Sequence, residues 1–256
     1  MTDTPPRATP PGQGAPPASA RSAEEQPGRG ALHHTLRFLR EIVVVVSMAL
    51  VLSLIVKTWV AQAFYIPSGS MEQTLQVGDR VLVSKLNKQF DGINRGDIVV
   101  FRDPGGWLPP TSSEAAEGLL GSAHRALIFV GLMPDPADEH LIKRVVGVGG
   151  DRVVCCDDSG RITVNGAPIE EPYVHPADQS STIEFDITVP REHVWVMGDH
   201  RSDSQDSRYH PMDGDGVEGS VPLDLVVGRA VVTVWPITRF STLPNHAETF
   251  SSVPAP

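Results

Sequence analysis

The feature that most limits the fold of this chain is an apolar run of membrane length near its N-terminus. Residues 42–56 read IVVVVSMALVLSLIV without a charge, and the chain stays mostly apolar for several residues after Lys57. A helix needs about 20 residues to cross a hydrocarbon core of about 30 Å. Residues 41–64 are therefore predicted to form a transmembrane helix, with Lys57 extending toward the headgroups. Trp59 and Tyr65 are typical of an interfacial aromatic belt.

The charges on either side of this run predict its orientation. Residues 1–40 carry five arginines against three acidic residues, whereas the chain after the run is strongly acidic. The positive-inside rule then leaves the N-terminus in the cytoplasm and the larger part outside, as a single-pass protein of the cell membrane. The arm itself is rich in Pro, Gly, Ala and Ser and is predicted to be disordered.

Two other interpretations of the apolar run were weighed. A cleavable secretory signal is suggested by Ala61-Gln62-Ala63, which resembles an A-x-A cleavage site. The forty-residue arm and the late position of Lys57 favour an uncleaved anchor instead. A buried core helix would need apolar partners that the rest of the chain does not offer. The lipid bilayer is thus an expected partner, whereas the net charge of −10 and the lack of a basic stripe exclude nucleic acid.

Beyond the run, residues 65–236 show the pattern of an all-β domain. Short β-branched runs alternate with Gly-Asp and Asn-Gly turn pairs. The predicted strands cover residues 79–83, 97–101, 141–146, 152–155, 161–164, 183–189, 194–197 and 226–234. Residues 104–137 lack this rhythm and are expected to form an inserted loop with one short helix near 114–129. Residues 237–256 are expected to be a frayed C-terminal tail.

The cysteines give little guidance about chemistry. Cys155 and Cys156 are the two cysteines and they are adjacent. They cannot form a zinc site alone, although a vicinal disulfide is sterically possible. Two partly buried free thiols are the favoured interpretation.

A candidate nucleophile lies directly after the apolar run. Pro67 fixes its own φ and Gly69 permits a sharp turn, so Ser68 and Ser70 are held on a bend between hydrophobic residues. Such a loop is more often an ordinary turn, and a serine nucleophile also needs a base.

The base need not be a histidine. The histidines show neither H-E-x-x-H spacing nor the context of a nucleophile elbow, so no metal is expected. Lys143 shares a strand face with the apolar Leu141 and Val145, and burial there would lower the pKa of its amine. A lysine that extends to solvent from an edge strand is the alternative. A third polar cluster, residues 197–209, is either a solvated loop or an ion-paired scaffold.

In this order, and behind an N-terminal span, these clusters resemble the motifs of type I signal peptidases. The resembling segments are PSGSM at 67–71, RGDIVVF at 95–101, IKRVVGVGGD at 142–151 and GDHRSDSQDSR at 198–208. The family form of the last segment is closer to GDNRDNSxDSR, so His200, Ser202 and Asp203 depart from it.

The resemblance implies a role for each matching residue. Ser70 would be the nucleophile and Lys143 its general base. Ser204 would orient the lysine amine, while Ser68 and the Ser70 N–H would hold the oxyanion. The positions that would brace the site are Arg144, Asp199, Asp206 and Arg208. Shallow pockets for small side chains would be lined by Phe64, Ile66, Val81 and Ile142.

The family also implies a fold and an activity. The fold would be a mainly β signal-peptidase-like domain with an inserted smaller β-subdomain at about 153–193. The activity would be that of a serine endopeptidase with no cofactor, which cleaves signal peptides from preproteins after an A-x-A-type site.

Two alternatives and one subsidiary hypothesis stand beside this one. A self-cleaving serine/lysine repressor would need a DNA-binding domain where this chain has an arm and a span. A non-catalytic, membrane-tethered β-domain that binds an extracytoplasmic partner is the second. A subsidiary hypothesis is that the enzyme cuts its own anchor after Ala63.

Overall fold

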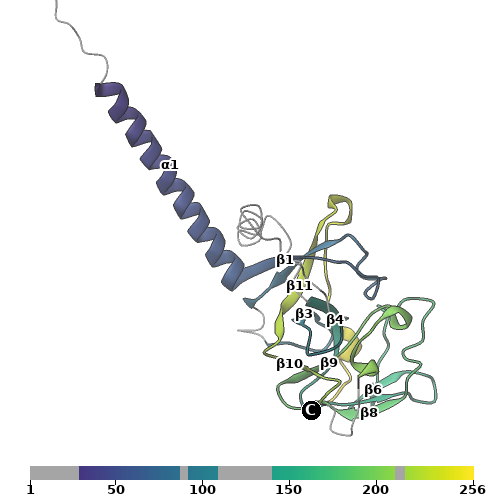
Figure 1. The fold of residues 1–256 in the computed structure, drawn as a ribbon. Helices are drawn as coiled ribbons and strands as arrows, with labels where there is room; N and C mark the ends of the chain where they lie inside the picture. The colour runs from purple at the N-terminus through teal and green to yellow at the C-terminus, as the bar shows by residue number, and fades with distance from the viewer. Residues whose placement is uncertain (1–28, 87–91, 109–139, 211–216) are drawn as a thin grey trace, which may run out of the picture. The chain divides into compact units, whose positions relative to one another are not determined.

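The computed structural model describes residues 29–86, 92–108, 140–210 and 217–256 (Figure 1). The chain divides into two compact units, Met1–Ser47 and Met48–Pro256. Residues 1–28 of the predicted disordered arm and the helix expected near 114–129 lie outside the described residues. The prediction of disorder is wrong for residues 29–40, which belong to a helix.

The apolar run forms a long helix, as predicted, but its limits differ. Helix α1 covers Arg29–Ile55 and continues into a π-helical turn, η1 (Val56–Val60). The stretch His34–Val60 is long and apolar enough to cross a membrane, and its central side chains are exposed rather than packed in a core. The predicted end at Phe64 is wrong, because Ala61–Tyr65 forms strand β1. Its backbone groups pair with a neighbouring strand, which offers hydrogen bonds that replace those of the helix.

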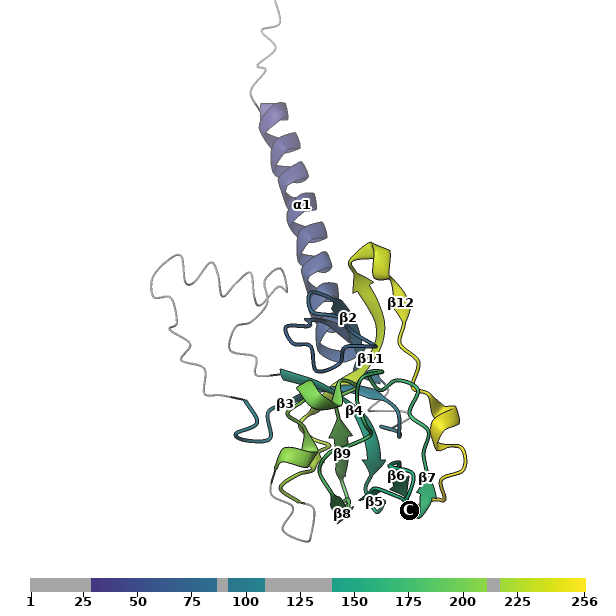
Figure 2. The same ribbon diagram turned by 90° about the vertical axis from the view of Figure 1, so that its right-hand side faces the viewer.

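The strands of the described residues form two antiparallel sheets. The larger has the strand order β1-β2-β11-β3-β4-β9-β10, with β12 paired to β11 (Figures 1 and 2). Its strands after β1 are β2 (Arg80–Ser84), β3 (Ile98–Arg102), β4 (His140–Val148), β9 (His193–Met197), β10 (Val221–Pro222), β11 (Val226–Trp235) and β12 (Ser241–Thr242). The smaller sheet has the order β7-β6-β5-β8, formed by β5 (Arg152–Cys155), β6 (Ile162–Val164), β7 (Ala167–Pro168) and β8 (Phe185–Thr188).

This architecture confirms the predicted mainly β fold. Each predicted strand is present within a few residues of its expected limits. Strands β1, β7, β10 and β12 were not predicted, because three of them have two residues each and β1 was assigned to the helix. The preference for free thiols was wrong, since Cys155 and Cys156 form a disulfide at the end of β5.

Side chains alternate between the two faces of the larger sheet, and apolar side chains form a hydrophobic core on each face. On β3, Val99 and Phe101 belong to one hydrophobic cluster, whereas Ile98 and Val100 belong to another. A third cluster joins the smaller sheet to Trp195 of β9. The strands that cross the middle of the domain are thus buried on both sides.

The C-terminal segment is packed and not frayed, which corrects the expectation for residues 237–256. Leu243 and Phe250 are only 6% and 7% exposed, and each belongs to a core cluster. Short 3-10 turns, η4 (Ile237–Arg239) and η5 (Ala247–Phe250), carry the segment over the domain. Arg239 also forms an ion pair with the buried Asp79 at 3.0 Å. Sequence analysis did not predict this packing, because the apolar residues of the segment are widely spaced among polar ones and form no periodic pattern.

Candidate active site

The candidate nucleophile lies in the loop between β1 and β2. Two backbone hydrogen bonds of 2.9 Å, from Ile66 to Asp79 and from Gly78 to Ile66, close the base of this loop. Within it, the Glu72 N–H donates to the Gly69 carbonyl at 2.8 Å. Met71, next to the serine, is fully buried in the core. The loop therefore holds Ser70 beside a fixed hydrophobic anchor.

Ser70 and Lys143 meet directly although 73 positions separate them. The Lys143 Nζ lies 2.6 Å from the Ser70 Oγ, and the two residues are 4% and 5% exposed. Lys143 stands on β4 opposite Val99 of β3, where the neighbouring side chains on that face are apolar. Burial lowers the pKa of the Lys143 amine to about 8, against the attraction of Asp206, which acts to raise it. A substantial fraction of the amine is thus neutral near pH 8 and able to accept a proton.

The other two serines named from sequence lie at the site with different contacts. The Ser68 Oγ is exposed and lies 3.4 Å from the Ser70 Oγ. The Ser204 Oγ is buried and donates to the Asp206 carboxylate at 2.7 Å. Among the described residues Ser204 makes no hydrogen bond to Lys143, so its role as the orienter of the amine stays a prediction.

Asp206 and Arg208 form a buried pair beneath the lysine. The Arg208 guanidinium donates to both Asp206 oxygens at 2.8 Å, and the Gly198 N–H donates to the same carboxylate at 3.0 Å. Burial acts to raise the pKa of Asp206, but the hydrogen bond and charge of Arg208 outweigh it and hold the pKa low. The carboxylate is therefore ionised near Lys143, where it limits how far burial can depress the lysine pKa.

Arg144 and Asp199 form a second buried pair on the opposite face of β4. Arg144 donates through two nitrogens to the Asp199 carboxylate at 2.8 and 2.7 Å, and both side chains are fully buried. Thr74 of the nucleophile loop donates to the same carboxylate at 2.5 Å. The pair thus ties the nucleophile loop to β4 and to the segment after β9.

A backbone contact joins the segment after β9 to the nucleophile itself. The His200 N–H donates to the Ser70 carbonyl at 3.1 Å. The neighbouring Gly198 has no room for a side chain, since a Cβ there would collide with the Ser70 carbonyl and the Ser204 Oγ. Close packing of these backbones fixes the position of Ser70.

Sequence reasoning missed part of this network. Tyr173 places its ring 4.1 Å below the Arg144 guanidinium, and Arg201 pairs with Glu171 at 2.6 Å, both side chains being 3% exposed. Arg201 lies inside the segment that resembles the family motif, so its buried position could have been suspected. Tyr173, Glu171 and Thr74 carry no signal in the sequence.

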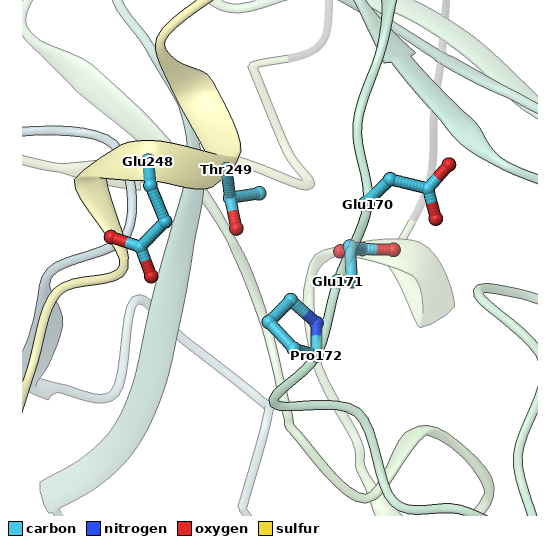
Figure 3. Close-up of a pocket in the computed structure, with 5 residues that line it drawn as sticks. All are labelled: Glu170, Glu171, Pro172, Glu248 and Thr249. Carbon is cyan, nitrogen blue, oxygen red and sulfur yellow. The ribbon is translucent and has the colours of Figure 1, made fainter.

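The four predicted pocket residues do lie together. Ile66, Val81 and Ile142 are buried in one hydrophobic cluster, and the half-buried Phe64 packs against it. A cavity of about 380 Å³ lies elsewhere and is lined by Glu170, Glu171, Pro172, Glu248 and Thr249 (Figure 3). In that view the Glu170 carboxylate points away from Thr249. Glu171 is already committed to Arg201, so this acidic cavity does not match a pocket for small apolar side chains.

Comparison with known proteins relates the chain to signal peptidases. It matches the family described as signal peptidase, peptidase S26, over residues 39–235. A probable signal peptidase I of Mycobacterium leprae is 38% identical over 227 residues, covering 79% of this chain and 78% of that protein. A signal peptidase I of Mycobacterium tuberculosis is 40% identical over 223 residues, covering 80% and 75%. A signal peptidase I of Leptolyngbya laminosa is 34% identical over 243 residues, covering 94% and 95%.

Proposed function

Because this chain belongs to the signal peptidase family, peptidase S26, we propose that Ser70 and Lys143 form its catalytic dyad. As a member of that family it is a membrane-anchored serine peptidase that acts on the signal peptides of preproteins. The observation that carries the dyad is the 2.6 Å contact between the Lys143 Nζ and the Ser70 Oγ, with both groups buried. A nucleophile within hydrogen-bond reach of a base of suitable pKa is what covalent catalysis requires.

The reaction proceeds by acyl transfer. The Ser70 Oγ attacks the scissile carbonyl carbon while the neutral Lys143 amine accepts its proton. The resulting ammonium gives that proton to the leaving amine, and the signal peptide stays bound as an ester of Ser70. Lys143 then takes a proton from water, the hydroxide attacks the ester, and Ser70 recovers its proton. The dyad needs no metal or cofactor, since the chain supplies both the nucleophile and the base.

The negative charge that develops on the scissile carbonyl oxygen during the attack needs hydrogen-bond donors to stabilise it. The Ser68 hydroxyl lies 3.4 Å from the nucleophilic oxygen, and the described residues give the Ser70 N–H no hydrogen-bond partner. Both are therefore free to donate to the oxyanion. We expect five buried residues to act as positioning residues around the dyad, namely Ser204, Asp206, Arg208, Arg144 and Asp199. Asp206, held by Arg208 and Ser204, acts on Lys143 through its charge, and the pair of Arg144 and Asp199 holds the nucleophile loop through Thr74.

The location of the site fits its substrate. Strand β1 begins directly after the apolar stretch His34–Val60, so Ser70 follows the anchor by only a few residues. We infer a single-pass protein of the cell membrane with its N-terminus in the cytoplasm and the site outside. A cleavage site of the A-x-A type would meet the cluster that contains Ile66, Val81 and Ile142. Because the site lies close to the membrane surface, the enzyme and its substrate are positioned near each other and need not meet by diffusion in three dimensions.

The test is cleavage of a preprotein by the full chain in detergent. Ser70→Ala and Lys143→Ala are each expected to lower kcat/KM by at least about 10³-fold. Ser202→Ala and Lys85→Ala serve as matched controls, since these residues lie outside the dyad and should retain activity. Full activity in either dyad variant would instead favour the alternative of a non-catalytic, membrane-tethered β-domain.

A further inference from the structure

Two histidines and a carboxylate converge beside the nucleophile loop without a role in the proposed reaction. Donor atoms of His175, Asp178 and His200 all lie within 4.8 Å of one another. The two imidazole rings are stacked with centroids 4.4 Å apart, and the His200 Nε2 lies 4.0 Å from an Asp178 oxygen. The side chains of Asp178 and His200 are 6% and 20% exposed, so the cluster is shielded but reachable. We propose that these residues form a binding site for a divalent transition-metal ion such as Zn²⁺.

The donor set is the first argument. Imidazole nitrogens and a carboxylate are ligands that Zn²⁺ binds at about 2.0–2.2 Å, which places donors about 3.4 Å apart around the ion. The observed separations are at most 4.8 Å, and the separation between the His200 Nε2 and the Asp178 oxygen is 4.0 Å, so small side-chain rotations would close the site. The Ala177 N–H approaches the His175 Nδ1 at 3.4 Å. A hydrogen bond of this length is weak, so a metal ion could replace it at Nδ1.

The surroundings of His200 are the second argument. Its Nδ1 is buried without a hydrogen-bond partner in the described part of the chain, and the nearest carboxylate oxygen, from Glu72, is 3.6 Å away. A histidine that binds a metal through one nitrogen usually donates its other N–H to a carboxylate. Binding through Nε2, on the Asp178 side, leaves Nδ1–H on the side of Glu72. A shift of the Glu72 side chain by a few tenths of an ångström would bring its carboxylate within hydrogen-bond distance of this nitrogen.

The third argument is how the ligands are held. The Ser202 N–H donates to Asp178 at 3.2 Å, and the His175 N–H donates to the Asp199 carbonyl at 2.9 Å. The His200 N–H in turn binds the Ser70 carbonyl. Each ligand is therefore anchored to the segments that fix the active site, and an ion here would crosslink two of them. His175 and Asp178 lie close together in the sequence, but His200 lies 22 positions beyond Asp178. This separation explains why motif spacing did not indicate the site.

The test is isothermal titration of Zn²⁺ into the full chain in detergent, after removal of metals with EDTA. Because the arm carries His33 and His34, every protein is prepared with both changed to Asn. We expect one Zn²⁺ per chain. Affinity should fall by more than about 100-fold in His200→Asn, His175→Asn and Asp178→Asn, and by about 10- to 100-fold in Glu72→Gln.

The control is His193→Asn, which removes a histidine outside the cluster and should leave affinity unchanged. The unfolding midpoint of each variant in EDTA checks that it is folded, and Zn²⁺ should raise the midpoint of the parent but not of His200→Asn. Absence of binding, or binding undiminished in the folded ligand variants, would overturn the proposal. Neither result bears on the dyad, because the test does not depend on peptidase activity.

Discussion

Burial of Lys143 should make the stability of the β-domain depend on pH in a way that one substitution removes. The substitution is Lys143→Met, which keeps a long unbranched side chain and deletes the amine. The fall of the lysine pKa from 10.5 to about 8 corresponds to about 3 kcal/mol, at about 1.36 kcal/mol for each pH unit. This free energy is what the folded protein loses by keeping a charged amine in a buried position.

The sign follows from proton binding. Below pH 8 the amine is protonated in both the folded and the unfolded chain, so the destabilisation is fully present. Between pH 8 and pH 10.5 the unfolded chain binds the proton and the folded chain does not, so the free energy of unfolding rises with pH. Above this window the contribution is constant. The variant lacks the group and should not show this rise.

The measurement is urea unfolding of the full chain in detergent, followed by tryptophan fluorescence, to which the buried Trp195 contributes. From pH 7 to pH 10.5 the free energy of unfolding of the wild type, minus that of Lys143→Met, should rise by about 3 kcal/mol. Titration of other groups cancels in this difference, and Lys85→Met controls for the loss of one positive charge. Parallel curves for wild type and Lys143→Met would refute the depressed pKa.

Two further predictions concern the scaffold and the C-terminal segment. Asp206→Asn removes the carboxylate that acts to raise the lysine pKa, so the acid limb of the kcat/KM profile should move to lower pH. It also leaves Arg208 buried without its partner and should lower stability by about 3–5 kcal/mol; an unmoved limb in a folded variant would contradict the assigned electrostatics. Phe250→Ala should cost about 3–5 kcal/mol in urea unfolding if the segment is packed as described, whereas a frayed segment would tolerate it.

Much of the fold was accessible from sequence because its signals are local. Alternating β-branched residues with Gly-Asp turns predicted the long strands, and the uncharged apolar run predicted a helix. The end of that helix was missed because Ala61–Tyr65 is apolar enough to extend it. What decides its conformation is pairing with Arg80–Ser84, a long-range contact without a local pattern.

The candidate site likewise has a part that the sequence predicts and a part that only folding determines. Ser70 and Lys143 lie in recognisable motifs, and alternation placed the lysine on an apolar face. The hydrogen-bond partner of Ser204 could not be predicted, because its hydroxyl could bind either the Lys143 amine or the Asp206 carboxylate. Only the packing of the folded chain selects Asp206. The pairing of Arg201 with Glu171 depends likewise on chain segments brought together by folding.

Strand β4 carries the base and the main brace of the site at adjacent positions. Lys143 reaches Ser70 from one face, whereas Arg144 meets Asp199 from the other, and both are in register with β3. Because strand side chains alternate, a slip of one residue would exchange their faces. A guanidinium, which does not lose its proton in proteins, would then face the nucleophile and leave it without a base. The strand can therefore vary by substitution at its apolar positions, but a shift of its register against β3 by one residue would remove the base from the site.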